Sequence, residues 1–160
     1  MVAFDASSMI HAWDNYPLEN FPPLWEWIAT EIASENIVLP QIAFEQIEKK
    51  APDCGKWLKD NSVHRIKESN DILTEASRIK GLLGIIDEGY SSKGVDEPDI
   101  FIIATSKVHD IQLISNERRQ FILPQVIANY KIPAVCSLPS VAISCLDFIQ
   151  FIRNTGTVFG

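Results

Sequence analysis

The residues of this chain best suited to chemistry are four carboxylates near the ends of apolar segments: Asp5, Glu45, Asp99 and Glu117. If those segments are parallel strands and the helices that follow them, all four positions face the crevice outside the carboxyl ends of the strands. Four carboxylates gathered there repel one another, so the cluster is stable mainly when a cation lies among them. Hard oxygen ligands without cysteine or histidine favour Mg²⁺ or Mn²⁺. The four residues are therefore predicted to be metal ligands and catalytic groups.

Each carboxylate also has a purely structural explanation. Asp96 is a suitable N-cap for the segment that follows it, which would make Asp99 a first-turn acid favoured by the helix dipole. Glu45 is spaced to pair with a lysine one helical turn later, and Glu117 stands beside two arginines, as in a solvated turn. Asp5 is harder to explain in this way, because an acid directly after a buried strand seldom lacks a partner.

Further polar residues near these positions are candidates to assist the site: Glu48, Asp96, Ser7 and Asn116. Glu48 would itself be the ligand if the helix were turned relative to the expected register. Seven basic residues are candidate contacts for a phosphate backbone: Lys49, Lys50, Lys56, Lys59, Arg65, Arg118 and Arg119. The sequence has no HExxH, no glycine-rich phosphate loop and no GxSxG, so it gives no support to histidine-based metal sites, nucleotide cofactors or serine hydrolases.

Apolar patterning predicts the elements that position these residues. Short apolar runs predict strands over 2–4, 37–39, 111–114 and 134–135. Helical spacing predicts helices over 24–33, 41–50, 70–83, 100–108 and 138–153, whereas 53–64 is polar and mixed. Strands that alternate with helices indicate a three-layer α/β/α fold with a central parallel sheet, in one domain over residues 1–160.

Composition limits the classes of function. The chain has 160 residues, of which 46% are apolar and 22% charged, which is enough to bury one core. Its net charge of -7 argues against a broad basic surface for nucleic acid, although acids neutralised by metal ions in one cleft would leave the same balance. No apolar run is long enough to span a membrane and the N-terminus lacks the features of a signal peptide, so a cytoplasmic location is expected.

The segments that carry the carboxylates resemble those of the PIN-domain family. Residues 2–8, Val-Ala-Phe-Asp-Ala-Ser-Ser, are similar to its opening strand, terminal aspartate and following small or hydroxyl residues. Residues 42–45, Ile-Ala-Phe-Glu, resemble the segment with its second acid. Residues 99–105, Asp-Ile-Phe-Ile-Ile-Ala-Thr, match its aspartate, apolar run and Ala-Thr pair, and this is the most specific part of the resemblance.

The remainder of the chain resembles the same family in the same order. Residues 113–117, followed by Phe121, are similar to its closing segment, with Ser115 in place of the commoner Thr and Glu117 in place of Asp or Asn. Residues 45–57 and 132–136 look like a bacterial and archaeal subgroup related to VapC toxins.

The resemblance implies a metal-dependent endoribonuclease that hydrolyses RNA phosphodiester bonds, with Asp5, Glu45, Asp99 and Glu117 holding Mg²⁺ or Mn²⁺. It also implies the toxin of a toxin–antitoxin pair, with an antitoxin protein as partner and a homodimer as assembly. The alternative is a catalytically inactive PIN-like scaffold that binds RNA or protein. A phosphatase with Asp5 as nucleophile is disfavoured, because position 7 is serine rather than a second aspartate.

Large apolar residues in charge-rich segments suggest where a partner would bind. The alternative is that they close the core. The residues concerned are Phe21, Trp25, Ile28, Trp57 and Leu58.

Overall fold

The computed structural model describes residues 1–160 as five parallel strands flanked by helices. The strands are β1 (Val2–Phe4), β2 (Ile37–Pro40), β3 (Arg65–Ile66), β4 (Gln112–Ile114) and β5 (Cys145–Leu146), in the order β3-β2-β1-β4-β5. The predicted α/β/α architecture with a central parallel sheet is confirmed. None of the helices is both long and apolar enough to cross a bilayer.

The strand β1 lies at the centre of the sheet, where the order in which successive strands are added changes direction. Val2 is paired with Ile37 of β2 on one side and with Gln112 of β4 on the other. The connections up to β3 therefore step one way across the sheet, and those after β3 step the other way. Crevices at such switch points, outside the carboxyl ends of the strands, are the usual binding sites of open parallel sheets.

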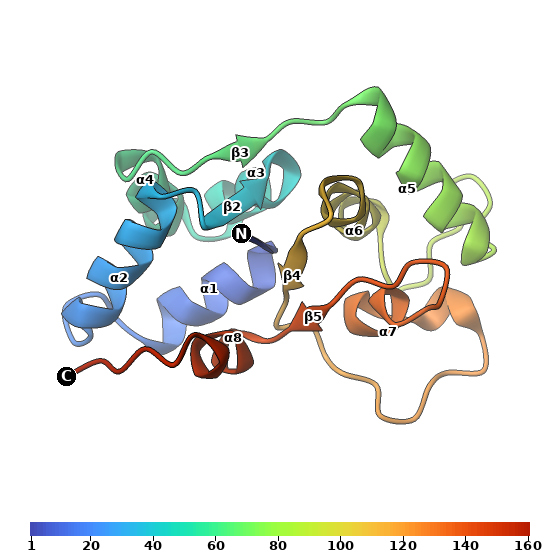
Figure 1. Cartoon of the computed structure of the whole chain (residues 1–160). Coiled ribbons are helices and arrows are strands. Elements are labelled where there is room, and N and C mark those ends of the chain that lie inside the picture. The colour runs from blue at the N-terminus through green and yellow to red at the C-terminus, as the bar shows by residue number, and fades with distance from the viewer.

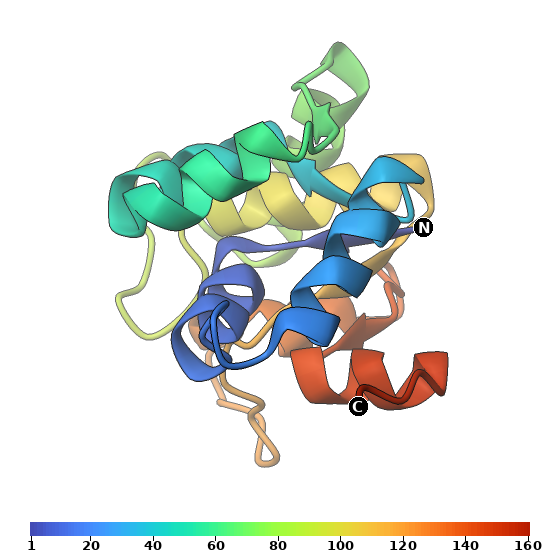
Figure 2. The ribbon, with the colours of Figure 1, turned by 90° about the vertical axis from the view of Figure 1, so that its left-hand side faces the viewer.

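The helices cover both faces of the sheet. They are α1 (Ala6–Asn15), α2 (Pro22–Ala33), α3 (Gln41–Lys50), α4 (Pro52–Asp60), α5 (Asn70–Leu82), α6 (Glu97–His109), α7 (Ile132–Cys136) and α8 (Phe148–Thr155), with a 3-10 turn, η1 (Ile127–Asn129). Right-handed crossovers place α1 and α2, which connect β1 to β2, on the opposite face from α5, α6 and α7. Figure 1 shows α1, α2 and α8 to the left of the sheet and α5, α6 and α7 to its right, and Figure 2 shows the left-hand side face on.

The sequence pattern explains why the central elements form. Nearly all residues of β1, β2 and β4 are buried, as expected of parallel strands covered on both faces. Pro22 and Pro23 lie in the first turn of α2, where a missing backbone N–H costs nothing. Asp5, Asp96 and Asp147 cap the N-termini of α1, α6 and α8 with their side chains.

The C-terminal third differs from the sequence prediction. Residues 134–135, predicted as a strand, belong to α7, and the last strand is Cys145–Leu146, inside a stretch predicted as one long helix. A short continuous apolar run does not distinguish a strand from a buried helix turn, and Pro133 in the first turn suits the helix. Residues 53–64, for which no element was predicted, contain most of α4.

Most of the residues expected to form a partner surface instead close the core. Trp25 is 3% exposed and Ile28 and Leu58 are fully buried, so they are unavailable to a partner. Trp25 and Trp57 pack edge to face at 4.9 Å between ring centroids. Of the five residues, Phe21 is exposed and Trp57 is half-buried.

Candidate active site

A cavity of about 280 Å³ opens at the switch point, beyond the carboxyl ends of β1 and β4. Its walls come from α1, α3, the first two turns of α6 and the segment after β4. The lining residues are Asp5, Ala6, Ser7, Ile10, Gln46, Lys50, Asp96, Asp99, Ile102 and Glu117. The structure thus brings together three of the four predicted site residues, together with Asp96 and Ser7.

Asp5 is fixed at the base of this cavity and is 2% exposed. The Ser7 hydroxyl donates to both carboxylate oxygens, at 2.8 and 2.7 Å, and the Ser115 hydroxyl donates to Oδ2 at 2.6 Å. The Ser8 backbone N–H donates to Oδ1 at 2.8 Å, so Asp5 is also the N-cap of α1. Burial raises the pKa of Asp5, and the serine hydrogen bonds act against that rise.

Asp99 combines a structural role with a position in the cavity. Asp96 and Asp99 form a capping box, in which each backbone N–H donates to the other side chain at 3.1 Å. Burial raises the pKa of Asp99 to about 7, and the negative charges of Asp96 and Glu117 add to the rise. The capping explanation is therefore correct, and the same two acids also face the cavity.

Glu117 is positioned by the turn after β4. Its backbone N–H donates to the Ser115 hydroxyl at 3.2 Å, and Asn116 donates its own N–H to Ser7 at 2.9 Å. The Asn116 side chain points elsewhere and accepts the N–H of Phe148 at the start of α8. Ser7 and Ser115 thus join the ends of β1 and β4, and Asn116 anchors α8.

The structure does not place Glu45 in the cavity. Glu45 is exposed and accepts a hydrogen bond at 3.0 Å from Gln41, while Glu48 pairs with Lys59. The residues of α3 that line the cavity are Gln46 and Lys50. Sequence reasoning counted Lys50 among the basic candidates but missed Gln46.

The helical period of α3 could have indicated that Gln46, and not Glu45, lies next to the buried face. The buried residues Ala43, Phe44 and Ile47 define the inner face of α3. Successive residues of a helix are about 100° apart, so Glu45 falls nearly opposite that face and Gln46 falls beside it.

The donor set of the cavity fits a hard divalent cation, since four carboxylates line it without any histidine or cysteine. The side chains do not form a closed coordination shell: no three His, Cys, Asp or Glu residues are placed to hold an ion together. Burial raises the pKa of Asp99, and the negative charges of Asp96 and Glu117 add to the rise; a cation in the cavity would relieve both effects.

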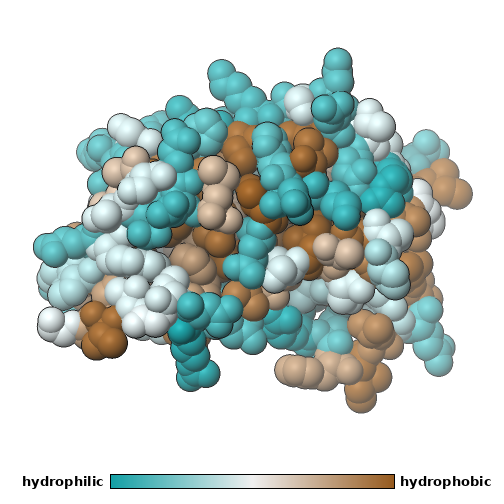
Figure 3. Space-filling model, in the orientation of Figure 1, coloured by the Kyte–Doolittle hydropathy of each residue, from teal (hydrophilic) through white to brown (hydrophobic).

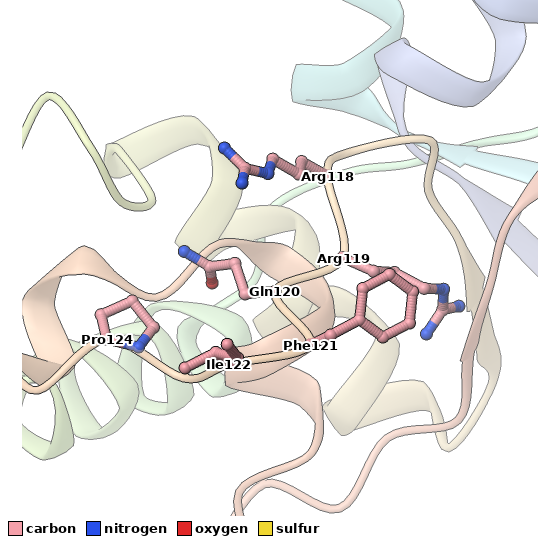
Figure 4. A pocket seen from close by; sticks show the side chains of 6 residues that line it. All are labelled: Arg118, Arg119, Gln120, Phe121, Ile122 and Pro124. Atoms are coloured by element: carbon pink, nitrogen blue, oxygen red, sulfur yellow. The ribbon is translucent and has the colours of Figure 1, made fainter.

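A second feature lies directly after Glu117, in the loop between β4 and α7. A wide hollow of about 690 Å³ is lined by Arg118, Arg119, Gln120, Phe121, Ile122 and Pro124, all from this loop (Figure 4). Phe121 is 93% exposed and Ile122 is 92% exposed. The loop extends from the body of the molecule in Figure 1, and brown side chains gather in the same place at the lower right of Figure 3.

Two solved structures are similar to this chain. A chain of a toxin–antitoxin complex from Klebsiella pneumoniae is 20% identical, with a TM-score of 0.49, and the match covers 82% of this chain and 100% of that one. A chain in the structure of VapBC2 from Rickettsia felis, which is bound to a DNA fragment from the VapBC2 promoter, is 14% identical with a TM-score of 0.57. The match covers 92% of this chain and 99% of that one. The fold is the PIN-like α/β/α fold that the sequence motifs predicted.

Residues 2–159 match the family described as "Domain of unknown function (DUF4411)", and the chain belongs to that family. No curated protein matches the sequence.

Proposed function

We propose that this protein is a metal-dependent endoribonuclease of the VapC toxin type. The observation that carries the proposal is the convergence of Asp5, Asp96, Asp99 and Glu117 on one cavity at the switch point of a PIN-like sheet. These acids come from three separate segments of the chain. A structural role explains each of them alone, but it does not explain why they face the same space.

Each residue of the site would have a distinct role in phosphodiester hydrolysis. Asp5, Asp99 and Glu117 would hold Mg²⁺ or Mn²⁺, which when bound neutralises charge on the scissile phosphate and lowers the pKa of the attacking water. Ser7 and Ser115 fix the orientation of Asp5 through the hydrogen bonds described above. Asp96 keeps Asp99 in place through the capping box, and Glu117, which also lines the cavity, would position the attacking water.

The test is cleavage of a mixed pool of labelled RNA oligonucleotides by the purified protein. We expect cleavage with Mg²⁺ or Mn²⁺, and none with EDTA or in the Asp5→Asn variant. Intact RNA under all conditions, with a folded wild-type protein, would overturn the proposal.

A catalytically inactive PIN-like scaffold is the second candidate, and one observation favours it. The α3 wall of the cavity presents an amide and an ammonium group rather than the carboxylate expected from the sequence. A scaffold of this kind would bind RNA in EDTA and leave it uncut when metal is added.

We further propose that an antitoxin protein covers the loop formed by residues 118–126. Single exposed apolar residues are common, but Phe121, Ile122, Leu123 and Val126 are all at least half exposed within six residues. The VapBC2 structure with which this fold agrees is bound to promoter DNA, and the expectation of an antitoxin partner comes from the resemblance of the sequence to VapC toxins. The alternative is that the loop forms a homodimer interface. Light scattering of the isolated protein would detect a homodimer, whereas an antitoxin would be recovered only by co-purification.

A further inference from the structure

The α3 wall of the cavity carries two side chains that have no partner in the protein. Gln46 and Lys50 are one helical turn apart, so they lie on the same face of α3. The side-chain contacts along this helix are made by other residues: Gln41 donates to Glu45, and Glu48 pairs with Lys59. An amide and an ammonium group are thus free to bind a ligand in the cavity.

Most other basic candidates are already engaged. Lys56 and Lys59 pair with carboxylates on the surface. Arg65 lies over an aromatic ring at 4.6 Å, and Arg119 donates to a backbone carbonyl at 2.7 Å. Lys50 is the basic residue that lines the carboxylate cavity.

The charges in the cavity require such a residue. Four carboxylates repel an anionic substrate, and they line the cavity from the N-terminus of α1, the start of α6 and the segment after β4. The ammonium group of Lys50, on α3, attracts a phosphate as a compact point charge, and the amide N–H of Gln46 next to it donates to a phosphate oxygen. The two walls therefore suit different ligands: oxygen ligands for a cation on one side, and donors for a phosphate on the other.

We propose that Lys50 and Gln46 bind the phosphate of the RNA at the scissile bond, so that α3 is the substrate-binding wall of the site. This inference rests on the proposed ribonuclease function. Lys50 would contact the substrate directly, and its positive charge favours RNA and opposes a cation. The two ligands consequently respond in opposite directions when that charge is removed.

The experiment compares Lys50→Gln with Lys49→Gln, its neighbour on α3, which is exposed and does not line the cavity. Binding of a labelled single-stranded RNA of mixed sequence is measured by fluorescence anisotropy in EDTA at several salt concentrations, and Mn²⁺ binding is measured by calorimetry without RNA. We expect Lys50→Gln to weaken RNA binding about fivefold and to reduce the salt slope by about 0.7, the value for one phosphate contact on a single strand. Mn²⁺ binding should be unchanged or tighter, and Lys50→Arg should restore RNA binding.

Gln46→Glu provides an independent arm, because it adds a carboxylate to α3 without a large change in shape. We expect tighter Mn²⁺ binding and weaker RNA binding, whereas Glu45→Gln, on the far side of α3, should change neither. If the wild-type protein cleaves RNA but Lys50→Gln and Lys49→Gln bind RNA equally well, this inference is overturned and the proposed function stands. A wild type that neither binds nor cleaves RNA would overturn the proposed function as well.

Discussion

Replacement of Asp99 by asparagine is expected to stabilise the metal-free protein at pH 8. Burial and the neighbouring acids raise the pKa of Asp99 from 3.8 to about 7, so its ionised form opposes folding. One pKa unit corresponds to about 1.4 kcal/mol, which places the cost of the charge at pH 8 at about 4 kcal/mol. Asparagine removes that charge but weakens the hydrogen bond from the Asp96 N–H, at a cost of about 1–2 kcal/mol. The expected net gain is about 2 kcal/mol.

The sign of the pH dependence follows from the same shift. Between about pH 4 and pH 7 the folded protein holds a proton on Asp99 that the unfolded chain has lost. The contribution of Asp99 to the free energy of unfolding therefore falls as pH rises through this window. The advantage of Asp99→Asn should be largest at pH 8 and should disappear near pH 4.

Urea titrations in EDTA at pH 5, 6.5 and 8 measure this effect. Asp71→Asn is the matched control, because Asp71 is an exposed first-turn acid of α5, and its loss should cost less than about 1 kcal/mol at each pH. A gain for Asp99→Asn that is independent of pH, or a loss of stability at pH 8, would refute the electrostatic description of the cavity.

The remaining predictions address the metal, the core, the loop and one glycine. Millimolar Mn²⁺ should raise the Tm of the wild type, more at pH 8 than at pH 6, because bound carboxylates must be ionised; unchanged melting curves in scanning fluorimetry would contradict a metal site. Trp25→Ala should lower the free energy of unfolding by about 3–5 kcal/mol in urea titrations, because the indole is buried and donates to the Tyr16 carbonyl; a loss below 1 kcal/mol would place Trp25 outside the core. Phe121→Ser should leave the Tm within about 2 °C of wild type, because the ring is exposed, but should reduce co-purification of a partner; equal recovery would exclude the loop as its binding surface. Gly94→Ala should destabilise the fold by about 1–3 kcal/mol, because a Cβ there would lie 2.0 Å from the Ala128 carbonyl oxygen; wild-type stability in urea would contradict this close approach.

The central part of the fold could be predicted from the sequence because its signals are strong and local. Buried parallel strands are continuously apolar, and the runs at 2–4, 37–39 and 111–114 all lie in the sheet or at its border. The edge strands β3 and β5 could not be predicted in this way. Each has two residues, and their pairing with Leu39 and Leu113 depends on the rest of the sheet being present.

The start of α8 could have been predicted from its capping residues, although the apolar period of the segment favoured a longer helix. Asp147 and Gln150 form a capping box, which marks the start of a helix at Phe148. The apolar spacing of 138–153 suggested one long helix because the short strand β5 (Cys145–Leu146) interrupts the segment without breaking the period.

The candidate site was predictable to the extent that its residues follow strands or begin helices. Asp5, Asp99 and Glu117 have positions fixed by such boundaries, and all three reach the cavity. Glu45 lies in the middle of a helix, where an error of one residue rotates the side chain by about 100°. The partners of Asp5 in the loop after β4 depend on tertiary contact between Ser115 and β1, which no local pattern reports.

The most direct test of the central claim is the rate of cleavage of 5′-labelled RNA under single-turnover conditions in Mn²⁺, compared between Glu117→Gln and Glu45→Gln. Both variants lose one glutamate charge, but Glu117 lines the cavity and Glu45 does not. We expect Glu117→Gln to lose at least about tenfold in rate, which corresponds to about 1.4 kcal/mol of transition-state stabilisation, and Glu45→Gln to cleave at the wild-type rate. A Glu45→Gln variant as impaired as Glu117→Gln, or a wild type that does not cleave RNA, would contradict the assignment of the catalytic centre to this cavity.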